Sequence, residues 1–105
     1  MSPIDLLEDK KVDIEDLCRR FCVKRLRLFG SAVTDEWDDQ KSDFDFLAEY
    51  AQESRSLPAL EQLVGLQLAL EDLLGRKVDV VNWAMAKNRF FRESAEAQAR
   101  ELYAA

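Results

Sequence analysis

The spacing of apolar residues along the chain predicts an alternation of helices and strands. Helices are expected over residues 4–10, 14–22, 58–74 and 87–103, strands over 24–29, 43–50 and 77–82, and polar loops over 34–42 and 51–56. A helix between the second and third strands forms a crossover connection. We therefore expect the α+β class (α/β two-layer), with a small mixed sheet covered by helices. The first two strands could pair either parallel or antiparallel.

Residues at the predicted helix ends support these boundaries. Asp13 is expected to cap the second helix, Pro58 to occupy the first turn of the third, and Gly75 to end that helix with a positive φ. Apolar residues spaced three and four apart predict the buried helix faces. These residues are Ile14, Leu17, Cys18, Phe21 and Cys22; Leu60, Leu63, Val64, Leu66, Leu70, Leu73 and Leu74; and Phe90, Phe91, Ala95, Ala99, Leu102 and Tyr103.

The first predicted strand has an apolar face and a basic face. Side chains two residues apart in a strand point the same way, so Leu26 and Leu28 share one face. Arg25 and Arg27 share the other.

Length and composition narrow the class of protein. At 105 residues the chain is expected to form one domain, 1–105. Its net charge of −6 argues against stable nucleic-acid binding, which depends on clustered lysine and arginine. The absence of histidine excludes Ser-His-Asp and Cys-His catalysis. No apolar run approaches the roughly 18 residues of a membrane span, and no signal-peptide pattern opens the chain, so we expect a cytoplasmic location.

The two cysteines are expected to be structural. Cys18 and Cys22 stand four residues apart on one face of the second predicted helix. Two cysteines alone cannot complete a zinc site, so we expect small buried apolar residues.

Two aspartates in the second predicted strand are candidates for metal binding. Asp43 and Asp45 alternate with Phe44 and Phe46, so both carboxylates project from one face of an extended strand. Neighbouring carboxylates repel each other unless a positive charge lies between them. A hard divalent cation such as Mg²⁺ accepts oxygen ligands and often binds together with a nucleotide phosphate.

The ends of the other two strands add to this candidate site. Gly30 and Ser31 follow the first strand, where a glycine lets the backbone approach an anion and a hydroxyl adds a donor. Asp79 is the one charged residue within residues 78–81, and a lone aspartate inside a strand carries a desolvation cost unless it is paired. It could face the same pocket, or it could be a strand-end carboxylate that lies near solvent or pairs with Arg76 or Lys77.

These residues, taken in order, resemble the motifs of the DNA polymerase β-like nucleotidyltransferase superfamily in its minimal form. The resemblance rests on residues 28–32, 42–47 and 73–81, which match the family's Gly-Ser, Asp-x-Asp and later Asp motifs in order and spacing. It covers most of residues 24–82 and implies the nucleotidyltransferase fold.

The resemblance also implies a reaction, in which AMP moves from ATP to an acceptor hydroxyl and pyrophosphate leaves. Gly30 and Ser31 would hold the β- and γ-phosphates, and Asp43 and Asp45 would bind the Mg²⁺ that bridges the triphosphate. Asp45 and Asp79 would bind a second Mg²⁺, or Asp79 would deprotonate the attacking hydroxyl.

One segment departs from the family pattern. Minimal members usually carry a basic, glycine-containing segment directly after Gly-Ser, whereas residues 32–37 contain no arginine. The loop that follows is expected to be solvated and acidic, and its charge disfavours ATP unless metal ions screen it. Its acidic residues are Asp35, Glu36, Asp38 and Asp39.

The resemblance implies a partner as well. Minimal proteins of this kind are commonly encoded beside a HEPN-domain protein as bacterial toxin–antitoxin pairs, so we expect an antitoxin that adenylylates a tyrosine of a HEPN toxin. A homo- or hetero-oligomer is compatible with this role. Trp37, Trp83, Phe90 and Phe91 are candidate interface residues, although aromatic residues are more often core. Two alternatives remain: a non-catalytic module that neutralises the partner by contact, and a nucleotidyltransferase acting on a small molecule such as an aminoglycoside.

Overall fold

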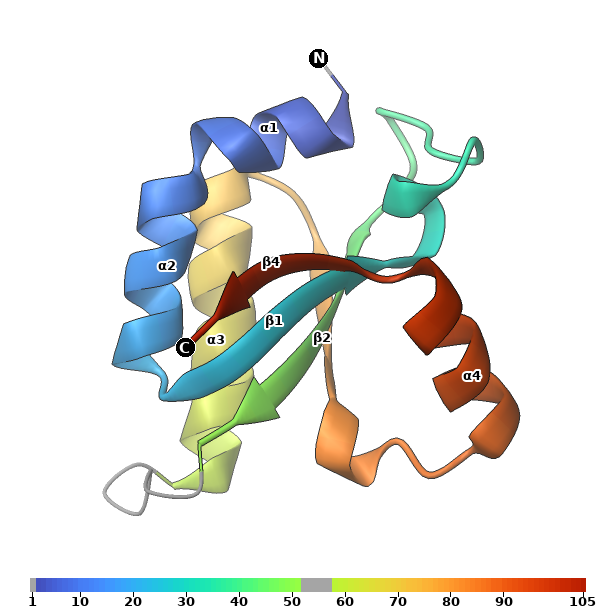
Figure 1. Ribbon diagram of the computed structural model, residues 1–105. Coiled ribbons are helices and arrows are strands. Elements are labelled where there is room, and N and C mark those ends of the chain that lie inside the picture. Colours follow the sequence, from blue (N-terminus) through green and yellow to red (C-terminus); the bar gives the residue numbers. More distant parts are fainter. Residues whose placement is uncertain (1, 52–57) are drawn as a thin grey trace.

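A mixed sheet with helices on both faces forms the framework of the protein (Figure 1). The computed structural model describes residues 2–51 and 58–105. In these ranges the elements are α1 (Pro3–Asp9), α2 (Lys11–Arg20), β1 (Val23–Phe29), η1 (Gly30–Val33), β2 (Phe44–Tyr50), α3 (Ala59–Leu74), β3 (Val78–Asn82), η2 (Trp83–Met85), α4 (Arg89–Gln98) and β4 (Arg100–Ala104). The predicted α+β class is confirmed.

The strand order β3-β2-β1-β4 follows from the connections between the strands. α3 provides the crossover that lets β2 and β3 run parallel, as the sequence predicted. β1 runs antiparallel to β2 and to β4, which answers the question that the sequence left open.

Two apolar clusters pack on opposite faces of this sheet. α1, α2 and α3 cover one face, where Leu26 and Leu28 of β1 are fully buried among helix residues such as Leu66 and Leu70. α4 covers the other face through Ala95, which packs with Leu47 and Trp83. The second face also carries the polar side chains of the candidate site.

The C-terminal prediction was wrong in part. A helix was expected over 87–103, but α4 ends at Gln98, and Arg100–Ala104 form β4 along the free edge of β1. An unpaired strand edge exposes backbone donors and acceptors, and β4 satisfies those of β1. Leu102 and Tyr103 pack against the core, as expected, but from a strand.

Predictions for the second helix also need correction. α2 begins at Lys11, directly after α1, so Asp13 lies in its first turn and does not cap it. Cys18 is fully buried as expected. Cys22 lies beyond the helix, with a left-handed φ of 59°, and does not share a helix face with Cys18.

The α3 prediction holds at its C-terminal end. Gly75 ends the helix with a φ of 68°, as expected. Pro58 is the N-cap residue rather than part of the first turn. Leu60 and Val64 were predicted to be buried, yet they are 72% and 45% exposed because only one side of α3 faces the sheet.

The remaining predictions concern loops and membrane spans. Residues 34–42 form a loop as predicted, whereas the expected loop at 51–56 lies, beyond residue 51, outside the described residues. Within residues 2–51 and 58–105, no helix combines the length and apolar character required to traverse a bilayer.

Candidate active site

Asp45 of β2 and Asp79 of β3 are register partners across the parallel ladder. Side chains of partner residues project from the same face of a sheet, so both carboxylates lie on the face that α4 partly covers. Phe29, the last residue of β1, is the partner of Asp45 on the other side. The pairing brings the two predicted carboxylates together at the end of the sheet where β1 ends and β2 begins.

Asp43 lies one residue before β2 and adds a third negative charge. Burial raises the pKa of Asp45 above its ordinary value of 3.8, and the charges of Asp79 and Asp43 raise it further. Asp79 and Asp43 therefore both act electrostatically on Asp45.

Gly30 brings the turn after β1 against Asp45. Its φ is +76°, a left-handed conformation that glycine adopts without steric cost. A Cβ atom at this position would lie 2.5 Å from Oδ2 of Asp45, closer than real Cβ atoms come. The glycine predicted to approach a phosphate therefore lies directly beside the predicted metal ligand.

Ser31 is the second residue of η1, directly after Gly30. It is half-buried, and its carbonyl accepts hydrogen bonds from the backbone N–H and the hydroxyl of Thr34. These hydrogen bonds fix the backbone of Ser31 in the turn that follows Gly30.

The predicted alternative for Asp79, an ion pair with Arg76 or Lys77, is absent. Among the ion pairs of residues 2–51 and 58–105, none involves Asp79, Asp45 or Asp43. Asp79 is exposed, which agrees with the alternative of a strand-end carboxylate near solvent, and the desolvation argument made for it was wrong. Its register with Asp45 places the two residues on one face of the sheet.

The donor set suits a hard cation. The charges of Asp79 and Asp43 both act on Asp45, and Gly30 lies directly against Oδ2 of Asp45. Oxygen ligands of this kind are those that Mg²⁺ prefers. As the side chains stand, no three acidic or cysteine residues of the described chain are arranged to enclose a metal ion.

The loop between η1 and β2 is acidic, as predicted, but it is anchored to the fold. Trp37 packs against Phe44, with ring centroids 4.9 Å apart, and the guanidinium of Arg76 lies 4.7 Å from the centroid of the Trp37 ring. From the sequence, we predicted Arg76 only as a possible ion-pair partner of Asp79. Its position directly after the helix-ending Gly75 was a signal that it lies beside the start of β3.

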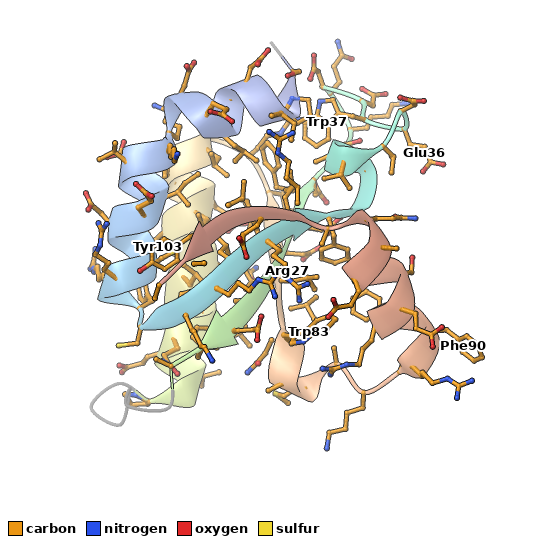
Figure 2. All side chains as sticks on the ribbon, in the orientation of Figure 1. Arg27, Glu36, Trp37, Trp83, Phe90 and Tyr103 are labelled. Carbon is orange, nitrogen blue, oxygen red and sulfur yellow. The ribbon has the colours of Figure 1, made fainter. Side chains whose placement is uncertain are left out.

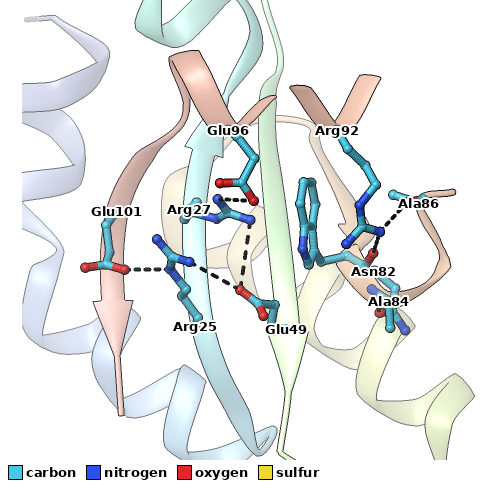
Figure 3. A network of polar contacts seen from close by, with 10 residues as sticks. Arg25, Arg27, Glu49, Asn82, Ala84, Ala86, Arg92, Glu96 and Glu101 are labelled. Atoms are coloured by element: carbon cyan, nitrogen blue, oxygen red, sulfur yellow. Dashed lines mark hydrogen bonds and ion pairs between the residues drawn. The ribbon is translucent and has the colours of Figure 1, made fainter. Parts of the chain in front are cut away.

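A polar network occupies the same sheet face further along the strands (Figure 3). Arg27, predicted to lie on a basic face, has a side chain only 4% exposed and lies 3.9 Å from Glu49 and 3.8 Å from Glu96. Its guanidinium stacks on Trp83, and Arg92 also lies over the Trp83 ring, 4.3 Å from the centroid. The network fastens η2 and α4 to the sheet.

The candidate interface aromatics differ in exposure (Figure 2). Trp83 is buried and Trp37 and Phe91 pack against the core clusters, so three of the four are core residues. Phe90 was also predicted to lie on a buried helix face, and that prediction was wrong: it is 73% exposed and projects from α4 away from the fold.

Comparison with known proteins places the chain in a family. The nucleotidyltransferase domain model matches residues 13–102. A relative from Methanocaldococcus jannaschii, "Putative protein adenylyltransferase MJ0128", is 34% identical over 92 residues, which span 88% of this chain and 86% of the relative.

Solved structures share the fold. A protein described as a "putative minimal nucleotidyltransferase" aligns with a TM-score of 0.75 at 29% identity, over 95% of each chain. A chain from the complex described as "tri-AMPylated Shewanella oneidensis HEPN toxin in complex with MNT antitoxin" aligns with a TM-score of 0.65 at 21% identity, over 93% of this chain and 72% of that one. The domain match over residues 13–102 and the relative at 34% identity show that the chain belongs to the nucleotidyltransferase domain family.

Proposed function

We propose that the protein is a Mg²⁺-dependent nucleotidyltransferase that moves AMP from ATP to a tyrosine hydroxyl of a HEPN toxin and so acts as its antitoxin. The observation that carries the proposal is the register pairing of Asp45 with Asp79 beside Gly30. In a chain of the nucleotidyltransferase family, this pairing gathers oxygen ligands next to a backbone corner suited to phosphate.

Gly30 and Ser31 would hold the β- and γ-phosphates of ATP. The left-handed Gly30 has no side chain to keep the phosphates away from the backbone, and the Ser31 hydroxyl can donate a hydrogen bond to a phosphate oxygen. The role of both residues is to orient the triphosphate in line with the attacking oxygen.

Asp43, Asp45 and Asp79 would hold one or two Mg²⁺ ions. Bound Mg²⁺ neutralises charge on the triphosphate and on the oxygens that enter and leave. The carboxylates contribute the negative charge that binds the cation; burial raises the pKa of Asp45, and repulsion from Asp79 and Asp43 raises it further. A bound cation would remove that repulsion.

Asp79 is the carboxylate most open to an acceptor, because it is exposed whereas Asp43 and Asp45 are half-buried. The tyrosine oxygen forms a bond to the α-phosphorus of ATP, and the bond from that phosphorus to the pyrophosphate oxygen breaks. The phenolic proton goes to Asp79, or it goes to solvent water when Asp79 serves as a metal ligand with Asp45.

The protein acceptor is supported by the relatives. The curated relative is named a protein adenylyltransferase, and a structural neighbour is a complex of an AMPylated HEPN toxin with an antitoxin. We propose the roles of protein adenylyltransferase and antitoxin for this chain because of its family and its fold.

AMP transfer from labelled ATP tests the proposal. The protein is incubated with ATP carrying a label on the α-phosphate, Mg²⁺ and a HEPN toxin as the acceptor. We expect label on a HEPN tyrosine, loss of labelling with Asp43→Ala or Asp45→Asn, and normal labelling with Asp72→Asn, an exposed aspartate on α3.

Two other outcomes would refute it. Neutralisation of the toxin that survives Asp45→Asn without label transfer would identify a module that acts by contact alone. Labelling of an aminoglycoside in the absence of the HEPN protein, with none on the protein in its presence, would identify a small-molecule enzyme.

A further inference from the structure

Arg76 is the centre of a clamp on the acidic loop. Its Nη2 donates hydrogen bonds to the carbonyl oxygens of Asp39 and Ser42, the latter at 3.1 Å. The same guanidinium lies over two aromatic rings, 4.7 Å from the centroid of Trp37 and 5.8 Å from that of Phe44. A planar group that stacks and donates at the same time is what arginine supplies and lysine does not.

The clamp acts on the backbone that carries Asp43. The carbonyl of Ser42, which Arg76 binds, belongs to the peptide that precedes Asp43. On the other side, the N–H of Phe44 donates to the carbonyl of Lys77 at 3.2 Å. Consecutive residues of the segment that enters β3 therefore hold both backbone neighbours of Asp43.

The same segment carries Asp79. It continues in register with β2 through Phe44 and Val78, and the next pair along is Asp45 and Asp79. The hydrogen bond from Arg76 to the Ser42 carbonyl thus joins the two segments just before their first paired residues, Phe44 and Val78. Within the described residues, this side chain is positioned to fix Asp43 relative to the Asp45–Asp79 pair without contacting any of the three carboxylates in an ion pair.

We propose that Arg76 is a positioning residue for the nucleotide site: it sets the place of Asp43 beside Asp45 and Asp79 by clamping the Ser42 carbonyl and the Trp37 ring. The proposal rests on the function proposed above, because it assigns Asp43 to the binding of Mg²⁺ and ATP. Residues that orient metal ligands commonly change metal affinity by about 10- to 100-fold when they are replaced. Arg76 belongs to this class.

The test compares Arg76→Lys with Arg20→Lys. Both changes keep the charge and remove a guanidinium that lies over a ring, since Arg20 lies 5.4 Å from the centroid of Phe21 on an exposed part of α2. Three quantities are measured in each variant: the affinity for Mg-ATP by calorimetry, the melting temperature, and amide hydrogen exchange by NMR in the absence of nucleotide.

We expect Arg76→Lys to weaken Mg-ATP binding by about tenfold or more, with faster exchange at the amides of Ser42 and Phe44 and unchanged exchange at Leu26. Arg20→Lys should match the wild type in affinity. If Arg76→Lys does not fold, Trp37→Phe provides the second variant, because it removes the indole donor to Asp39 and reduces the ring under the guanidinium. It should produce the same local change to a smaller degree.

The outcomes separate this inference from the proposed function. Wild-type protein that binds no Mg-ATP would defeat the proposed function and with it this assignment, whatever the exchange data show. Wild-type protein that binds normally, together with Arg76→Lys (or its substitute Trp37→Phe) that binds equally well, would overturn the role of Arg76 alone. Faster exchange throughout the sheet, including Leu26, would also overturn it, because it would assign Arg76 to general stability.

Discussion

Asp45 and Asp79 occupy equivalent positions on adjacent parallel strands, and each is the other's register partner. No ion pair among residues 2–51 and 58–105 neutralises either of them. Burial together with the charges of Asp79 and Asp43 raises the pKa of Asp45. Strand register thus creates a concentration of negative charge at one end of the sheet, a state that a bound cation would stabilise.

Replacement of Asp45 by Asn should make the protein more stable at neutral pH in the absence of metal. The pKa of Asp45 is raised in the folded state, so the folded protein loses stability relative to the unfolded chain as pH rises through that value. Below the ordinary pKa of 3.8 the carboxyl is protonated in both states and the penalty vanishes. Urea unfolding of both proteins at a series of pH values checks this.

The comparison has an internal control. Saturating Mg²⁺ should raise the stability of the wild type and leave Asp45→Asn nearly unchanged. A wild-type protein that is as stable as the variant at neutral pH without metal would show that the carboxylates do not strain the fold.

Replacement of Gly30 by Ala should weaken both folding and ATP binding. A residue with a side chain at a left-handed φ costs about 1–2 kcal/mol, and the new Cβ would lie 2.5 Å from Oδ2 of Asp45. Gly75→Ala is the matched control, because Gly75 has a φ of +68° with no neighbouring atom within 4 Å of an added Cβ.

Denaturant unfolding and ATP calorimetry should show a loss of stability in both variants and a loss of affinity only in Gly30→Ala. Equal ATP affinity in the two variants would argue against a role for the Gly30–Asp45 approach.

Replacement of Arg27 by Ala should destabilise the protein by about 3 kcal/mol, because it removes a buried cation together with its ion pairs and its packing on Trp83. Its side chain is 4% exposed, between Glu49 and Glu96 and over Trp83. Arg25→Ala is the control: Arg25 pairs with Glu49 and Glu101 at 41% exposure and should cost less than about 1 kcal/mol. The difference is measured by urea unfolding, and similar losses in the two variants would contradict the buried network.

Cys18 should resist thiol reagents in the native protein. Burial, with a smaller contribution from Glu15, raises the pKa of its thiol to about 12, so almost no reactive thiolate forms at pH 8. In a Cys22→Ser background, mass spectrometry should detect alkylation of Cys18 only when denaturant is added. Rapid alkylation without denaturant would show that the contact of α2 with the sheet opens easily.

Local patterns were sufficient for the elements that their own side chains define. Alternation in β1 correctly separated Leu26 and Leu28 from Arg25 and Arg27, and Gly75 marked the end of α3. The β4 strand was missed because Ala95 and Ala99 continue a helical spacing, and because a strand at an edge is stabilised by backbone pairing with a distant element rather than by its own sequence.

The candidate site, like the fold, could be predicted only in part from local sequence patterns. The ordered motifs drew attention to the Gly-Ser corner and to the three aspartates, but the partner of Asp45 depends on the register of two strands that α3 separates in the sequence. The burial of Arg27 and the clamp of Arg76 depend on aromatic side chains from remote segments, Trp83 and Trp37. A charged residue in a sequence gives no sign of which ring will cover it.

Calorimetric titration of ATP into the protein, with and without Mg²⁺, tests the proposed nucleotide site most directly. We predict binding that requires Mg²⁺, that weakens by at least about tenfold in Asp45→Asn, and that is unchanged in Asp72→Asn. Binding of equal strength without Mg²⁺, or in Asp45→Asn, would contradict the assignment of these carboxylates to a metal-dependent nucleotide site.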